Sequence, residues 1–115
     1  AYSPLGRGFL TGAIRSRSDL QPGDWRLQNP RFSEQSIAAN NRLADAVAEV
    51  AQSIKATPAQ VALAWVLSRG VAAIPGTRRI DRLEENWASQ EIVLAKGDLD
   101  RLESLISHGV AGARY

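Results

Sequence analysis

The sequence contains no cysteine, which excludes a disulfide framework, a thiolate nucleophile and a metal site built on thiolates. It also lacks an apolar run of the roughly 18 residues that a membrane-spanning helix needs. Its first residues do not show the basic and then apolar order of a signal peptide. These absences predict a protein without a membrane partner, and we expect it in the cytoplasm.

Neither sign of charge dominates the chain. Its 14 Lys and Arg residues oppose 12 Asp and Glu residues, for a net charge of +2. Nucleic-acid-binding proteins concentrate their basic residues in a stripe, whereas the only dense basic cluster here is Arg78, Arg79 and Arg82. We therefore expect no nucleic-acid partner. The length of 115 residues and the hydrophobic fraction of 44% indicate a single globular segment, residues 1–115.

Hydrophobic periodicity predicts a chain dominated by helices. Apolar residues recur every three to four positions from about residue 36 to residue 54, as on one face of a helix. Thr57, Pro58 and Gln60 then form a helix start, with a cap, a proline at the first position and a capping box. Further helices are expected from near residue 80 and around residues 99–106.

Two short extended segments each lead through a loop into helices. Residues 1–3 precede Pro4, which forces extended geometry on the residue before it. Residues 71–74, "VAAI", form a short apolar segment that ends at Pro75. Residues 13–35 have no clean period and predict a long irregular loop. The order indicates an α/β fold of two βα units with extra helices.

Two parallel strands cannot form a stable sheet alone, because parallel strands need neighbours and both faces covered. The pattern therefore favours part of a larger α/β fold, whose open strand edges would promote self-association if the part is isolated. The alternative is a small, mostly helical domain in which both extended segments are ordinary buried chain.

The first motif with chemical potential is "YSPLGRG", residues 2–8. A strand end followed by closely spaced glycines exposes backbone N–H groups, and such a nest suits a phosphate. The motif is neither a Walker loop nor a dinucleotide fingerprint. A purely structural turn is the alternative interpretation.

The second motif is "IPGTRRIDRLEEN", residues 74–86. Arg78 and Arg82 are four residues apart and share a helix face, where they can clamp a phosphate beside the unpaired N–H groups of the helix start. Glu85 and Asn86 lie about one turn further and can hydrogen-bond a base or ribose edge. The alternative is a solvated charged face on a surface helix.

The two motifs together favour a ligand. Loops that follow parallel strands open on the same carboxyl edge of an α/β fold, where ligands bind. A pyrophosphate on one loop and a 2′-phosphate on the other would suit a dinucleotide.

Both motifs resemble the aldo/keto reductase family at its seventh and eighth barrel strands. The similarity extends to "TPAQVALAWVLSRG", which matches the family's helix before the last strand, and to "VLAKGDLDRLESL", which matches a C-terminal helix. The resemblance implies the C-terminal portion of a (β/α)8 TIM barrel. It also implies an oxidoreductase that binds NADP(H) and reduces small-molecule carbonyl substrates, aldehydes or ketones, reversibly to alcohols by hydride transfer.

The resemblance assigns the first loop to the nicotinamide and pyrophosphate. Tyr2 falls where the family stacks an aromatic ring on the nicotinamide. Ser3, Leu5 and Gly6 match residues that line the pyrophosphate, and Gly8 lies in the same loop.

The second loop is assigned to the adenosine half of the cofactor. Thr77 and Arg78 match the start of the 2′-phosphate site, and Arg82 matches the arginine that contacts this phosphate beside the adenine. Glu85 and Asn86 match the pair that hydrogen-bond the adenine. Many members carry a Lys where this sequence has a glycine before Thr77, so Arg78 and Arg82 form the cationic pair here.

The resemblance also implies that the catalytic residues are absent. The family's tetrad of Asp, Tyr, Lys and His lies on earlier strands, and neither Tyr2 nor Tyr115 matches its proton-donating Tyr. We therefore assign no catalytic residue and no metal ligand, and we expect the chain by itself to be inactive. The alternative is a catalytically inert fragment, or a structural or regulatory nucleotide-binding module.

Several aromatic residues carry structural expectations. Trp65 is expected in the core, and Trp87 is expected to pack between the last two helices. Trp25 and Phe32, in the long loop, either anchor it to the core or close over cofactor and substrate. His108 is expected to be exposed or to cap a helix.

Overall fold

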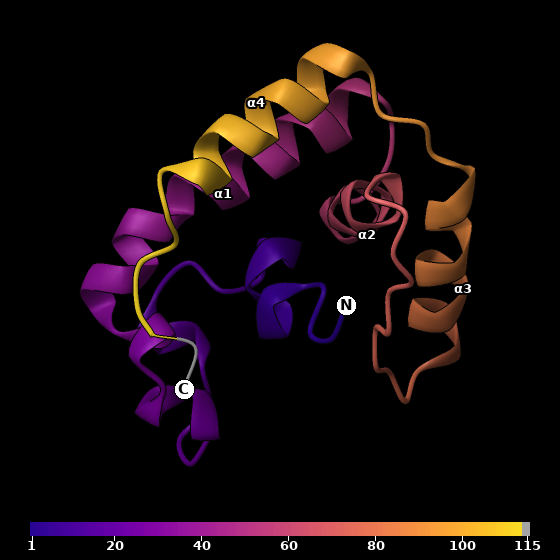
Figure 1. Cartoon of the computed structure of the whole chain (residues 1–115). Coiled ribbons are helices and arrows are strands. Elements are labelled where there is room, and N and C mark those ends of the chain that lie inside the picture. The colour runs from indigo at the N-terminus through magenta and orange to yellow at the C-terminus, as the bar shows by residue number, and fades with distance from the viewer. Residues whose placement is uncertain (114–115) are drawn as a thin grey trace.

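Helices dominate the computed structural model, which describes residues 1–113 (Figure 1). Residue Tyr115 lies outside the described residues. The α-helices are α1 (Glu34–Ser53), α2 (Pro58–Ser68), α3 (Ile80–Ala88) and α4 (Lys96–Ser107). The 3-10 helices are η1 (Gly6–Thr11), η2 (Arg17–Asp19), η3 (Trp25–Gln28), η4 (Pro30–Phe32) and η5 (Ser89–Glu91). All four predicted helices are present.

The two predicted strands are reduced to one contact. Tyr2 and Ile74 form an isolated parallel bridge, and the Ile74 N–H donates to the Ala1 carbonyl at 3.1 Å. No strand is assigned within residues 1–113. The predicted direction of the pair is therefore confirmed and the predicted extent is wrong. Two isolated segments lack the flanking strands that would prolong a parallel ladder.

The main core lies where α1, α2 and α4 meet. Helix α4 lies along α1 and runs in the opposite direction, while α2 packs against α1 (Figure 1). The buried members of this core are Ala46, Val47, Val50, Ala51, Val61, Ala64, Leu94 and Leu102. Trp65 packs against the edge of this core and is only half-buried.

A second apolar cluster fixes the N-terminal third of the chain onto the first half of α1. Its buried members are Phe9, Ile14, Leu20, Phe32, Ile37 and Ala44. The rings of Phe9 and Phe32 meet edge to face, with centroids 6.3 Å apart. The loop predicted over residues 13–35 is thus irregular, but it is packed against α1, and the buried Phe32 holds it there.

The start of α2 follows its sequence signature. Thr57 Oγ1 accepts a hydrogen bond from the Gln60 N–H at 3.2 Å, and Gln60 Oε1 accepts one from the Thr57 N–H at 3.0 Å. Pro58 occupies the first turn. Both partners of the capping box therefore satisfy N–H groups that a helix start leaves unpaired.

Replacing Thr57 with Ala is expected to lower the free energy of unfolding by about 0.5–2 kcal/mol, because the cap acceptor is lost. Thr57→Ser keeps the hydroxyl and is expected to stay close to wild type. Urea unfolding followed by circular dichroism measures both variants. An unchanged Thr57→Ala midpoint would contradict a stabilising cap.

The apolar face of α3 is uncovered. Ile80, Leu83 and Trp87 are 76%, 58% and 72% exposed. The prediction that Trp87 packs between the last two helices is therefore wrong, because α4 packs on α1 and not on α3. No helix within residues 1–113 combines the length and apolar character that crossing a membrane requires.

Candidate functional site

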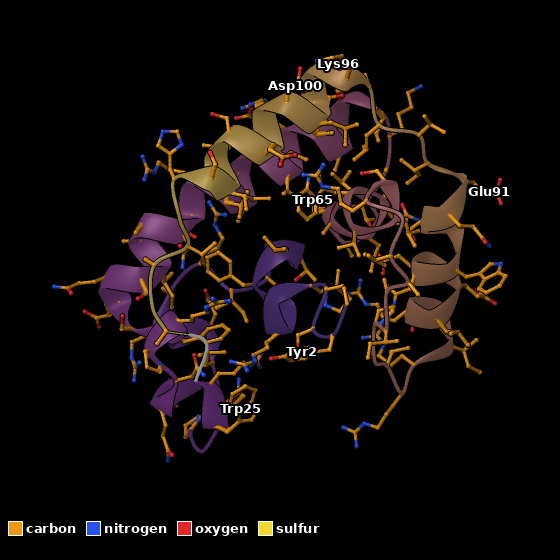
Figure 2. All side chains as sticks on the ribbon, viewed as in Figure 1. Tyr2, Trp25, Trp65, Glu91, Lys96 and Asp100 are labelled. Atoms are coloured by element: carbon orange, nitrogen blue, oxygen red, sulfur yellow. The ribbon has the colours of Figure 1, made fainter. Side chains whose placement is uncertain are left out.

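Both predicted ligand loops leave the same end of the Tyr2–Ile74 pair. The bridge is parallel, so the chain continues from Tyr2 into Ser3 and from Ile74 into Pro75 at one edge. Figure 2 shows Tyr2 a little below the centre of the view, and the loop before α3 extends downward beside this region. The carboxyl ends of parallel strands are where α/β folds place their ligands.

The first loop is built from left-handed backbone. Ser3, Gly6, Arg7 and Gly8 have φ values of +49°, +58°, +59° and +93°, which is uncommon for the two residues with side chains. The extended geometry expected for Ser3 before Pro4 is therefore wrong. The Gly6 N–H donates to the Ser3 carbonyl at 2.9 Å, and the Gly8 N–H to the Leu5 carbonyl at 3.1 Å. These two amides therefore hold the shape of the loop itself. The expectation that the glycines leave their N–H groups free for a phosphate is wrong for Gly6 and Gly8.

The side chains of the first loop differ in exposure. Tyr2 is 44% exposed, and Ser3 is exposed beside it, whereas Leu5, Gly6 and Gly8 are half-buried. Tyr2 and Ser3 are thus accessible to solvent at the edge where the loop leaves the Tyr2–Ile74 pair, and the turn that follows them is half-buried.

The second loop presents cations at the start of α3. Thr77 Oγ1 accepts from the Arg79 N–H at 3.1 Å, and Arg79 pairs with Asp81, with Nε 3.0 Å from Oδ1. This pairing raises the pKa of Arg79 and lowers the pKa of Asp81. Arg78 is exposed and has no ion-pair partner within residues 1–113. Arg78 is therefore the available cation of the loop.

Arg82 is held in place by Glu85. Arg82 Nη1 lies 2.6 Å from Glu85 Oε2, and the Arg82 side chain is 51% exposed against 14% for Glu85. The Glu85 carbonyl accepts from Gln60 Nε2 at 3.1 Å. Burial raises the pKa of Glu85, but hydrogen bonds from the Thr57 hydroxyl and from Arg82 outweigh it, so the pKa is lowered. The start of α2 thus fixes an ionised Glu85, which in turn orients Arg82.

Asn86 lies at a groove between α2 and α3. The groove has a volume of about 290 Å³ and is lined in part by Leu63, Leu83 and Trp87. The Asn86 carbonyl accepts from Ser89 Oγ at 2.6 Å. Glu85 and Asn86, the two residues predicted to hydrogen-bond the adenine, are both half-buried. They lie at the border between the charged and apolar parts of α3.

Sequence reasoning missed a contact between the first loop and residues 13–35. Arg26 Nη1 donates to the Arg7 carbonyl at 2.9 Å, and the Arg7 guanidinium lies 5.0 Å from the centroid of the Trp25 ring. Trp25 is 56% exposed and so does not anchor the core as Phe32 does. Nothing in the sequence indicates that Arg26 binds a partner 19 residues away.

Asp24 is expected to titrate below the ordinary pKa of an aspartate. Side-chain and backbone hydrogen bonds from Arg26 lower the pKa of Asp24 from its ordinary value of 3.8 to about 2. Because the folded pKa is depressed, the contact stabilises the loop fully above about pH 4 and is lost as the pH falls toward 2. Carboxyl carbon shifts in an NMR titration measure the midpoint. A midpoint near 3.8 would contradict the contact, and Asp24→Asn removes the signal as a control.

No group of His, Asp and Glu side chains suited to a metal ion occurs in the part of the chain that the structure describes. His108 is exposed, and its Nδ1 lies 2.5 Å from the Ser104 carbonyl at the end of α4. As expected, His108 is therefore exposed and caps the C-terminal end of α4.

Comparisons of the sequence with known proteins point to one family. A sequence model described as the Aldo/keto reductase family matches residues 1–107. The chain is 38% identical to the fission yeast (Schizosaccharomyces pombe) aldo-keto reductase yakc, whose name specifies NADP(+), over 99% of this chain and 34% of that protein. It is 39% identical to an aldo-keto reductase of Gibberella moniliformis, over 92% and 33% of the two chains. It is 40% identical to the aldo-keto reductase str7 of Strobilurus tenacellus, over 91% and 32%.

The chain spans about a third of the length of these relatives. The helix-dominated structure is compatible with part of the barrel that the family implies. The match covers both predicted ligand loops and all four α-helices, and on this basis the chain belongs to the aldo/keto reductase family.

Proposed function

We propose that this chain is the cofactor-binding C-terminal part of an NADP(H)-dependent aldo/keto reductase. The observation that carries the proposal is the parallel Tyr2–Ile74 bridge, from which both ligand loops leave at one edge. The parent enzyme would reduce an aldehyde or ketone to an alcohol, with its catalytic tetrad in a part of the fold outside these 115 residues. The relative named for NADP(+) supports this choice of cofactor.

The residues of the second loop fit the adenosine phosphate. Arg78 is an exposed cation, and Arg82 is half-exposed and oriented by Glu85. Both lie at or near the start of α3, where unpaired N–H groups and the positive end of the helix dipole favour an anion. Arg78 and Arg82 would hold the 2′-phosphate, with Thr77 at the start of this site and Glu85 and Asn86 beside the adenine.

The residues of the first loop fit the other half of the cofactor. The exposed ring of Tyr2 would stack on the nicotinamide, and Ser3, Leu5, Gly6 and Gly8 would line the pyrophosphate. NADP(H) supplies the hydride when bound. This chain would hold it in place, and no side chain here is assigned a proton to transfer.

Titration of the 115-residue chain with NADPH, followed by tryptophan fluorescence, tests the proposal. We expect saturable binding, competition by 2′,5′-ADP, which carries the adenosine half of the cofactor, and no turnover of a generic aldehyde. Absence of binding to either ligand would favour the inert-fragment alternative. Turnover by this chain alone would contradict the placement of the chemistry elsewhere.

A further inference from the structure

We propose that Arg26 is a positioning residue that fixes the Arg7–Gly8 peptide of the first loop and so sets the affinity of that loop for a pyrophosphate. The inference rests on the proposed function, because that function assigns the pyrophosphate to residues 3–8. It adds a residue from the 13–35 segment that neither the sequence nor the comparisons assign to the site.

The guanidinium of Arg26 is itself held on several sides. Asp24 receives Arg26 Nε at 3.0 Å and Arg26 Nη2 at 2.6 Å, and it also accepts the Arg26 N–H at 2.9 Å. The Arg26 guanidinium lies 6.0 Å from the centroid of the buried Phe32 ring, and its side chain is 27% exposed. An arginine fixed by a carboxylate fork and an aromatic ring loses little freedom when it donates a further hydrogen bond.

That further hydrogen bond holds an unfavourable backbone conformation. Arg26 Nη1 donates to the carbonyl of Arg7 at 2.9 Å, and Arg7 is a non-glycine residue at φ +59°. A side chain at position 8 would also be restricted, because a Cβ built on Gly8 lies 3.3 Å from Arg26 Nη1. The Arg7 guanidinium, 5.0 Å from the centroid of the Trp25 ring, is a second contact between the first loop and the 13–35 segment.

Both ends of the Arg7–Gly8 peptide are therefore fixed. Its carbonyl is bound by Arg26, and its N–H donates to the Leu5 carbonyl at 3.1 Å. Without Arg26 the peptide keeps only the hydrogen bond from the Gly8 N–H to the Leu5 carbonyl. It can then flip more readily, and a flip would reverse the carbonyl dipole within the loop. The Gly8 N–H is used within the loop and is not itself a phosphate donor. Because carbonyl oxygens repel a phosphate, the hydrogen bond that holds the Arg7 carbonyl on Arg26 favours the anion.

Arg26→Gln tests the inference, with Arg101→Gln as the matched control. Arg101 is an arginine on α4 that pairs with Glu49, away from both ligand loops. We expect Arg26→Gln to raise the Kd for NADPH about tenfold, the factor that corresponds to one hydrogen bond to a charged group. The Kd for 2′,5′-ADP is expected to change less than twofold, since that ligand needs residues 77–86. Arg101→Gln is expected to change neither, and Arg26→Lys, which keeps one donor, is expected to fall between wild type and Arg26→Gln.

Hydrogen exchange gives a readout that does not depend on ligand binding. The amide of Gly8 is expected to exchange about tenfold faster in Arg26→Gln, whereas amides in α2 keep their rates. If circular dichroism shows that Arg26→Gln does not fold, Asp24→Asn replaces it, with an expected increase of about threefold in both the NADPH Kd and the Gly8 exchange rate.

The outcomes separate the inference from the proposed function. An unchanged NADPH Kd in a folded Arg26→Gln variant overturns the inference and leaves the proposed function intact. Equal losses for NADPH and 2′,5′-ADP also overturn it, since Arg26 would then act on the whole fold. If the wild type binds neither ligand, the proposed function fails, and the Gly8 exchange rate still decides whether Arg26 fixes the peptide.

Discussion

Replacing both Arg78 and Arg82 with Ala is expected to raise the Kd for NADPH by about 100-fold or more, because each hydrogen bond from arginine to a phosphate contributes about 1.5–3 kcal/mol. The Kd for NADH, which lacks the 2′-phosphate, is expected to change less than about threefold, since no such hydrogen bond is lost. Fluorescence titration with both nucleotides measures the ratio. The selectivity for NADPH over NADH is therefore expected to disappear.

The matched control is Arg79→Ala. Arg79 lies beside Arg78 at the start of α3, but Asp81 binds two nitrogens of its guanidinium, whereas Glu85 binds one nitrogen of Arg82. The loss of Arg79 is therefore expected to leave the nucleotide preference in place. An equal loss of NADPH affinity in Arg79→Ala would indicate a diffuse positive field in place of a defined phosphate site. Retention of full NADPH selectivity in the double variant would contradict the assignment of Arg78 and Arg82.

Replacing Phe32 with Ala is expected to lower the free energy of unfolding by about 3–5 kcal/mol. Phe32 is 1% exposed, meets Phe9 edge to face and supports the guanidinium of Arg26. Its removal leaves a cavity between α1 and the long loop that neighbouring side chains cannot fill without breaking these contacts. Urea unfolding measures the change.

Trp87→Ala provides the contrast, because Trp87 is larger than Phe32 but 72% exposed. Its replacement is expected to change the free energy of unfolding of this chain by no more than about 0.5 kcal/mol. A loss comparable to that of Phe32→Ala would show that the face of α3 is covered in solution.

Local signals predicted the helices. The capping box of Thr57 and Gln60 involves residues three apart, so the start of α2 could be located from the sequence, and the 3.6-residue period did the same for α1. That both proposed ligand loops follow extended segments at one edge was also predictable. The ion pair of Arg82 with Glu85 was not predicted, although Glu85 is three residues away on the same helix face.

Long-range contacts could not be predicted in the same way. The hydrogen bond from Arg26 to the Arg7 carbonyl depends on how the long loop folds back, and no periodic pattern specifies that path. Trp87 was placed in the interior because an amphipathic helix predicts a buried face, but the pattern does not say which element covers it. The strands at Tyr2 and Ile74 were predicted from their flanking prolines, yet a ladder needs neighbours that this chain does not contain.

The most direct measurement is the set of amide shifts in an NMR spectrum of the labelled chain as NADP+ is added. We expect amides of residues 3–8 and of residues 77–86 to shift together and to saturate with one Kd, because both loops leave one edge of the Tyr2–Ile74 pair. Shifts confined to one loop, or shifts of the two loops with different Kd values, would contradict a single cofactor site formed by both.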